Sequence, residues 1–247
     1  MVIVDVYCVL WPKQRHLTPA AVVYVLGLAM AVCLGTAPLN AASVETKTTP
    51  FAIGAEIGTA GYGPTVIFTL SKYFTATGGY TWLKYNYNAS SSDADYNGKL
   101  KLSNVQAFVN WHPFAGTFHL SAGAFFSNNR VGVTGQPKSS STFDVGGTTY
   151  TAAQVGTMSG NVELAKNMEP YLGLGWTKKP LNGGIGYFVD FGILFTPTAK
   201  ASLTASGSIA NDPTFQTNLR KEEREIDHDL KPLRYYPIVQ AGMLYRF

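Results

Sequence analysis

Two groups of residues in this sequence have the types and spacing that hydrolytic chemistry uses. His119 and Ser121 are separated by one residue, so an extended strand places both on one face, where a histidine can activate a serine nucleophile. Asp227, His228 and Asp229 set two carboxylates beside an imidazole, but they lie in a charged helical run, where consecutive side chains point in different directions. We interpret both groups as coincidences of spacing and predict that the protein is not an enzyme.

Other signals of chemistry are sparse. Cys8 and Cys33 are the two cysteines, and both lie in an N-terminal segment that we expect to be removed, which excludes a disulfide framework and thiolate metal ligands from the remaining chain. The sequence has no dense histidine cluster, glycine-rich phosphate loop or Rossmann pattern, and no dense basic patch of the kind that binds nucleic acid. It therefore predicts no cofactor, no metal site and no nucleic-acid partner.

The elements that carry these residues alternate with a period of two. The last strand shows this most clearly, because Phe247, Tyr245, Met243, Ala241 and Val239 form one apolar phase that ends in an aromatic pair. A strand with an apolar outer face is what a membrane-spanning barrel requires, since lipid meets every second side chain. The pattern predicts an all-β protein in which each strand shows one face to lipid.

Composition favours the same class. Only 14% of the 247 residues are charged, 13% are aromatic and 25 are glycine, yet the mean hydropathy is only +0.03. A soluble domain usually has about a quarter of its residues charged, and a helical membrane protein has several apolar runs of about 20 residues, of which none follows residue 45. A barrel fits both observations, because only half of each strand faces lipid.

The terminal strand and the segment Pro170-Tyr171-Leu172-Gly173-Leu174-Gly175 resemble those of small outer-membrane β-barrels of Gram-negative bacteria, the OmpW and OmpA types. The resemblance implies a closed up-and-down antiparallel transmembrane barrel of 8 to 10 strands in the outer membrane. It also implies that outer-membrane lipid surrounds the barrel and that the barrel assembly machinery recognises the strand ending in Phe247. It carries over no individual residue of a transport path.

The alternation and the turn residues place the strands and their connections. Counting back from the C-terminus assigns 113–116 and 167–169 to periplasmic turns, and 88–98, 132–154, 177–184 and 209–234 to extracellular loops. Asn97-Gly98 and Asn182-Gly183-Gly184 predict tight reversals. The expected strands are 76–88, 99–112, 117–131, 155–165, 170–177, 184–195, 199–208 and 235–247, preceded by a hairpin within 51–72.

Two of the long loops are expected to have structure of their own. Gly146-Gly147 predicts a small hairpin in 142–150. Asp212-Pro213 is a good helix start, and apolar residues recur at helical spacing up to Pro232, which predicts a short amphipathic helix. The charged face of that helix is either simply solvated or a surface for a partner.

Assigning the apolar phase of every strand to lipid leaves the polar phase facing the lumen. Both signs of charge then point inward. These residues form either a structural network that fixes strand register or the lining of a path for a small solute. The charged and ionisable candidates are Glu56, Lys84, His119, Glu163, Asp190 and Arg246.

The N-terminus predicts a secretory signal peptide. A basic patch at 13–16 precedes an apolar run, 17–34, and small residues at 37–43 offer a cleavage site. We expect residues 1–42 to be removed and residues 43–247 to form the barrel domain; the alternative is an N-terminal membrane anchor. The function predicted first is a small passive channel or solute-binding barrel, and the alternative is a non-conducting structural or surface-interaction barrel that acts through its extracellular loops.

Overall fold

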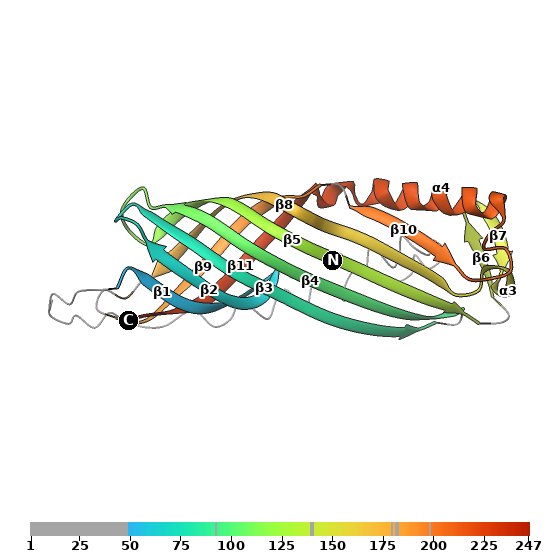
Figure 1. Ribbon diagram of the computed structural model, residues 1–247, viewed down its shortest axis with the longest axis horizontal. Coiled ribbons are helices and arrows are strands. Elements are labelled where there is room, and N and C mark those ends of the chain that lie inside the picture. The colour runs from blue at the N-terminus through green and yellow to red at the C-terminus, as the bar shows by residue number, and fades with distance from the viewer. Residues whose placement is uncertain (1–48, 92, 139–140, 179, 181–182, 198) are drawn as a thin grey trace. The chain divides into compact units, whose positions relative to one another are not determined.

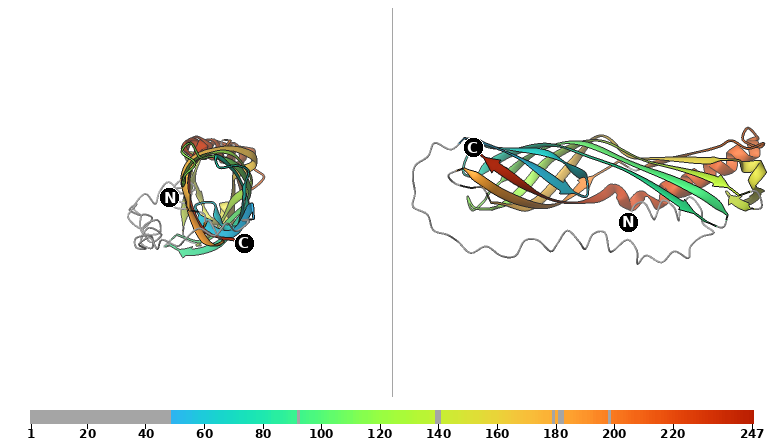
Figure 2. Two further views of the ribbon diagram at one scale, coloured as in Figure 1. Left: turned by 90° about the vertical axis from the view of Figure 1, so that its left-hand side faces the viewer. Right: turned by 90° about the horizontal axis from the view of Figure 1, so that it is seen from below.

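The expected closed antiparallel barrel is confirmed. The computed structural model describes residues 49–91, 93–138, 141–178, 180, 183–197 and 199–247, so the expected signal peptide lies outside the described residues. Within them, eight strands pair in a ring that closes between β8 and β9 and between β1 and β11 (Figure 2, left). These strands are β1 (Phe51–Gly58), β2 (Gly61–Thr69), β3 (Phe74–Ser90), β4 (Ala94–Trp111), β5 (Phe118–Pro137), β8 (Met158–Lys178), β9 (Gly184–Phe195) and β11 (Tyr235–Arg246).

The outer face of the ring is apolar because one phase of each strand carries the large apolar side chains. Val105 and Val109 on β4, and Ile185 and Ile193 on β9, are exposed, while the residues between them along each strand point inward. The terminal strand follows the same rule, with Met243 among the most exposed side chains of the ring. We call this eight-stranded ring the wall, and the end that holds Phe247 the terminal end.

The predicted turn at 167–169 is wrong. β8 runs without interruption from Met158 to Lys178, and Asn167 pairs with Ser127 of β5. Asn167 does adopt a φ of 95°, which asparagine tolerates better than most residues, but the chain kinks there without reversing. The expected strands 155–165 and 170–177 are therefore one.

Removing that turn also changes the side on which the next connection lies. The link between β8 and β9 was expected to be an extracellular loop, but Gly184 pairs with Arg246, which puts the link at the terminal end. Gly183 and Gly184 have φ values of 82° and 110°, so the expected glycine reversal occurs here. Asn97-Gly98, by contrast, lies inside β4, where Asn97 pairs with Asn88.

Beyond the wall, strands β3, β4, β5 and β8 continue as a curved sheet that is joined by other elements (Figure 1). We call this region, residues 83–102, 129–165 and 199–234, the head. The segment expected as a wall strand at 199–208 belongs here, because β10 pairs only with β8. The added elements are the hairpin β6 (Thr142–Val145) and β7 (Thr148–Thr151), α3 (Ala152–Val155), β10 (Lys200–Ala205), α4 (Pro213–Asp229) and the 3₁₀ helix η3 (Lys231–Arg234).

The inner face of the head is apolar, the reverse of the wall. Val131 and Val133 of β5 and Val162 of β8 are buried, whereas the alternate phase is polar. Phe143 from the hairpin lies in the same core, together with the buried face of α4. Burial of apolar area of this kind stabilises water-soluble domains. The inner apolar residues of the head are Ala94, Tyr96, Leu102, Val131, Val133, Phe143, Val145, Ala152, Val155, Met158, Val162, Leu203, Phe215, Leu219, Ile226 and Leu230.

Helix α4 confirms the expected amphipathic helix in the last long loop. The Asp212 carboxylate accepts hydrogen bonds from the amides of Thr214 and Phe215, and Pro213 fills the first turn, where no amide donor is needed. Phe215, Leu219 and Ile226 form the buried stripe. Among the described residues, no helix is long and apolar enough to cross a membrane.

Two carboxylates of α4 complete the free edge of β10. Asp227 Oδ1 accepts the Ala201 amide at 2.7 Å, and Glu223 Oε1 accepts the Leu203 amide at 2.7 Å. The spacing matches because four residues of helix span about 6 Å and two residues of strand about 7 Å. Asp227, one of the residues of the carboxylate–histidine group, therefore satisfies a strand edge, a role that sheet edges commonly require.

The same helix holds the β6–β7 hairpin. Glu222 Oε2 accepts the Gly146 amide at 3.1 Å, and Lys221 Nζ donates to the Gly146 carbonyl at 3.1 Å. Burial raises the pKa of the Glu222 carboxyl above its ordinary value, an effect that the Gly146 amide partly opposes. The hairpin turn occurs at Gly146 and Gly147, as predicted.

Candidate functional site

The candidate site is a layer of polar side chains inside the wall. It is contributed by strands that are distant in sequence, because inward residues of all eight strands converge on one narrow lumen. Glu56 of β1 accepts a hydrogen bond from the Gln106 side chain of β4, and Asp190 of β9 lies near the Gln240 amide of β11 at 3.5 Å. Each of these four residues is less than 10% exposed.

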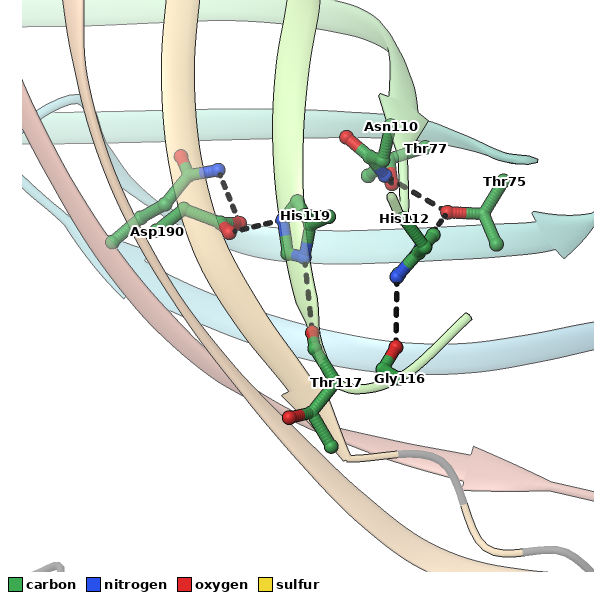
Figure 3. A network of polar contacts seen from close by, with 9 residues as sticks. Thr75, Thr77, Asn110, His112, Gly116, Thr117, His119 and Asp190 are labelled. Atoms are coloured by element: carbon green, nitrogen blue, oxygen red, sulfur yellow. Dashed lines mark hydrogen bonds and ion pairs between the residues drawn. The ribbon is translucent and has the colours of Figure 1, made fainter. Parts of the chain in front are cut away.

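His119 and Asp190 form the central hydrogen-bonded pair of this layer (Figure 3). His119 Nε2 lies 2.8 Å from Asp190 Oδ1, and His119 Nδ1 lies 3.5 Å from the Thr117 carbonyl oxygen. The His119 side chain is 1% exposed. A pair this deeply buried loses its hydration, so the carboxylate and the ring depend on each other and on the surrounding donors.

Two glycines make room for the carboxylates. A Cβ at position 79 would lie 2.9 Å from Glu56 Oε1 and 2.7 Å from Gln106 Nε2, and a Cβ at position 175 would collide with Asp190 Oδ1. Any larger side chain at Gly79 or Gly175 would push these groups out of the layer. The glycines are therefore part of the site, although they offer no functional group.

A second polar group lies next to the first, beside the turn that links β4 and β5. His112 Nε2 is 3.2 Å from Thr75 Oγ1, and its Nδ1 is 3.0 Å from the Gly116 carbonyl oxygen. Asn110 donates to the hydroxyls of Thr75 and Thr77. Figure 3 shows the rings of His112 and His119 close together, and their centroids are 5.2 Å apart. Sequence analysis did not single out His112, which lies just outside the strand.

An aromatic cluster lies beyond the His119–Asp190 pair, towards the head. Phe108, Phe125 and Tyr171 pack against one another, with ring centroids 4.6 to 5.6 Å apart. Leu194 of β9 and Ile238 of β11 belong to the same buried cluster, so side chains from both sides of the ring meet. We call these five residues the aromatic layer; they form a buried cluster inside the ring.

An acidic residue that was not predicted from the sequence lies next to the aromatic layer. Glu169 pairs with Phe125 across β8 and β5 and is fully buried, and neither of its carboxylate oxygens has a hydrogen-bond partner in the described part of the chain. Ser127 Oγ and the Tyr171 hydroxyl also lack one among these residues. Because 167–169 was predicted to be a turn, Glu169 was not considered as an inward-facing strand residue. Its even spacing from Ala165 and Tyr171 along the strand could have indicated that it points inward.

The six predicted lumen residues separate into two groups. Glu56, His119 and Asp190 lie on the inner face of the wall, and Arg246 lies at its terminal end, where its guanidinium donates to the carbonyls of Thr49 and Pro180. Lys84 and Glu163 do not face the lumen. Both are exposed on the outer face of the head, where the apolar phase points inward and the polar phase outward.

The two arrangements that resembled hydrolytic sites are not assembled as such. Ser121 is buried on the same face as His119, but the ring nitrogens of His119 are directed at Asp190 and Thr117. His228 lies on the exposed surface of α4, 3.7 Å from Asp229. In the described part of the chain, no group of three or more His, Cys, Asp or Glu residues is arranged to hold a metal ion.

Two solved structures share this fold. CarO of Acinetobacter baumannii aligns with a TM-score of 0.56 at 21% identity, over 81% of this chain and 98% of that chain. CarO2 of the same organism aligns with a TM-score of 0.57 at 20% identity, over 82% of this chain and all of that one. No protein-family model and no curated protein matches the sequence. The likeness confirms, at the level of the fold, the resemblance to small outer-membrane barrels.

Proposed function

We propose that this protein is a non-catalytic outer-membrane β-barrel of a Gram-negative bacterium, with a lumen closed by side chains and a head that makes its functional contacts. The outward apolar phase of the wall and the fold shared with CarO support the membrane location. In this orientation the terminal end faces the periplasm and the head stands outside the cell. The non-conducting surface-interaction barrel, which was the alternative prediction from the sequence, is thus preferred over the small passive channel.

The observation that carries this proposal is the aromatic layer. Phe125, Tyr171 and Ile238 are at most 1% exposed, and they come from strands on different sides of the ring. An eight-stranded barrel is just wide enough inside for side chains to fill it. A layer of this kind leaves no room for a hydrated solute to pass while it stays in place.

The experiment is conductance of the refolded mature barrel in planar bilayers, after heat-dependent mobility on gels has verified the fold. We expect the wild type to give no steps and the double variant Phe125→Ala, Tyr171→Ala to give discrete ones. Phe118→Ala, on the outer face of β5, is the matched control and should stay silent. Steps from the wild type would overturn the closed lumen.

A second candidate function, binding or passage of a small solute, is supported by the unpartnered polar atoms inside the wall. Glu56 Oε2 and Gln106 Oε1 lack partners among the described residues, as do both oxygens of Glu169. Under this function Asp190→Asn changes the ion selectivity of the conductance, while Glu163→Gln, on the outer surface, leaves it unchanged. Equal effects of both substitutions would contradict a lined path.

Removal of the β6–β7 hairpin tests whether the head makes the functional contacts of the protein. Replacement of residues 142–151 by a short glycine-serine linker should abolish binding of intact bacteria to host or abiotic surfaces while the heat-dependent gel shift persists. Unaltered binding would contradict a role for the hairpin. The absence of catalysis is checked with Ser121→Ala and His119→Ala, which should leave the lipid profile of the cell unchanged.

Recognition of the terminal strand by the barrel assembly machinery is part of the same proposal. Phe247 packs against Phe51 and Tyr245, with ring centroids 5.9 and 5.1 Å away, and is exposed at the end of the wall. Deletion of Phe247 should lower the fraction of heat-shifted barrel recovered from cells without preventing refolding in detergent. Equal recovery from cells would contradict this role.

A further inference from the structure

A row of cations crosses the outer surface where the wall meets the head. Lys84 of β3 pairs directly with Lys101 of β4, and Lys101 pairs directly with Arg130 of β5. The register continues through Glu163 of β8 to Lys200 of β10. All five side chains are exposed on the outer face. We call Lys84, Lys101 and Arg130 the cation row.

This arrangement is unfavourable by itself. Directly opposed residues on antiparallel strands have Cβ atoms about 5 Å apart, and like charges at that separation repel. Glu163 is opposite Arg130, yet in the described part of the chain neither it nor any other carboxylate forms an ion pair with a member of the row. Glu163 is a single carboxylate beside three adjacent cations, so an excess of positive charge remains for an anion from outside the protein to neutralise.

The row also lies at a defined depth. Two residues closer to the terminal end, β3 carries Trp82, which stacks on Tyr80 at 5.5 Å and contacts Tyr62 of β2 at 5.2 Å. Aromatic side chains of this kind mark the boundary between hydrocarbon and water in membrane proteins. Two residues of a strand tilted in a barrel rise by about 5 Å along the membrane normal, so Lys84 lies just above that boundary, close to the lipid headgroups.

The sequence of β4 shows the same transition along one face. From the terminal end, its outward residues are Trp111, Val109, Ala107 and Val105, then Ser103, then Lys101 and Lys99. Lys99 adds a fourth cation one step further into water. The change from apolar to charged occurs within four residues of β4.

We infer that the cation row binds the phosphate groups of an anionic membrane lipid in the outer leaflet. The planar guanidinium of Arg130 can grip two phosphate oxygens at once, and the two lysines supply point charges on either side. The inference rests on the membrane location proposed above and is independent of whether the lumen conducts. It assigns Lys84, expected in the lumen, to the lipid-facing surface.

The test is native mass spectrometry of the detergent-solubilised full mature barrel, with a phosphorylated outer-leaflet glycolipid as the probe. The triple variant Lys84→Gln, Lys101→Gln, Arg130→Gln should bind this lipid about 100-fold more weakly, since each cation near a membrane surface contributes about fivefold. Removal of the phosphates from the lipid should weaken wild-type binding to a similar extent. Heat-dependent mobility verifies that each variant is folded.

The matched control removes three cations from elsewhere in the head. Arg220→Gln, Arg224→Gln, Lys231→Gln lowers the net charge equally from exposed positions on α4 and η3 and should retain wild-type lipid binding. If both triple variants lost lipid binding equally, the effect would be explained by net charge and the inference would be overturned. The inference would also be overturned if free inorganic phosphate displaced the lipid when present at the same concentration as the lipid. Tighter binding of an acidic peptide than of the lipid would overturn it too. If the barrel conducts ions but still binds the lipid, the proposed closed lumen is contradicted and the lipid-binding inference stands.

Discussion

The wall and the head are built on the same strands with opposite polarity. On β5, the inward residues of the wall include His119, Ser121 and Ser127, whereas those of the head are Val131 and Val133. The strand keeps its alternation throughout, so the backbone is the same and only the surroundings differ. In the proposed orientation lipid replaces water outside the wall, so the residues that avoid water face outward in one region and inward in the other.

The comparison shows that alternation identifies the two faces of a strand but does not say which face is inside. That choice depends on the solvent, which in the proposed orientation changes along the long strands near the level of Trp82. The substitutions below test whether the two regions obey different rules, and whether they unfold together.

Truncation of the cores should have the largest effect. Phe125 in the aromatic layer and Phe215 in the head are both fully buried, and replacement of either by alanine should lower the free energy of unfolding of its region by about 3 to 5 kcal/mol. We expect Phe125→Ala to weaken the whole barrel in urea titrations. Phe215→Ala should instead make the head sensitive to protease while the heat-dependent gel shift remains. If this variant lost the gel shift as well, the wall and the head would unfold as one cooperative unit.

A charge on the outer face should distinguish the two solvents. Ala107→Arg, midway between Ser103 and Trp111 on the outer face of β4, places a cation against lipid near the middle of the membrane and should destabilise the barrel by about 2 to 4 kcal/mol in vesicles. Asn97→Arg, on the same face of β4 but in the head, should change stability by no more than about 0.5 kcal/mol. Urea unfolding followed by tryptophan fluorescence measures both, and similar losses would contradict the boundary at Trp82.

The edge of β10 should respond to the two carboxylates that complete it. Asp227→Ala or Glu223→Ala removes a charged acceptor and should cost about 1 to 3 kcal/mol within the head. Hydrogen exchange at the Ala201 and Leu203 amides should accelerate at least tenfold. Glu225→Ala, on the exposed face of the same helix, is the control, and a comparable acceleration there would contradict the assignment.

The smallest effect should be a pH dependence confined to the head. Burial raises the pKa of Glu222 in the folded protein, so its contribution to stability is full below the unfolded pKa and is lost as the pH rises through the folded pKa. Protection of the β6–β7 hairpin from hydrogen exchange should therefore fall with rising pH, after correction for intrinsic exchange. In Glu222→Gln this decline should disappear; its persistence would assign it to another group.

The sequence predicted the wall better than the head, for a physical reason. Assigning the apolar phase to lipid is correct for Val105, Val109 and Ile185, because these residues do face lipid in the proposed orientation. The same rule fails for Lys84 and Glu163, because above Trp82 the apolar phase forms a core. Along β4 the change is visible as Val105, Ser103 and Lys101 on one face, but a rule that assigns one solvent to the whole strand does not use it.

The site was predictable in part. Glu56 and Asp190 are polar residues on otherwise apolar strands, so their inward positions followed from alternation alone. Their partners did not, because register across the ring determines that His119 meets Asp190 and that Gln106 meets Glu56. The aromatic layer was concealed for a further reason: an inward phenylalanine such as Phe125 breaks the rule that polar side chains face the lumen.

The length of β5 and β8 has a consequence for what can reach this protein. With 20 and 21 residues they span about 65 Å along the strand, of which lipid needs only about ten residues. The remaining half, about 30 Å of strand, continues the same sheet beyond the membrane, with a register shift between Asn129 and Arg130 where the two regions meet. A large molecule approaching a crowded cell could therefore touch the hairpin and α4 without coming near the bilayer.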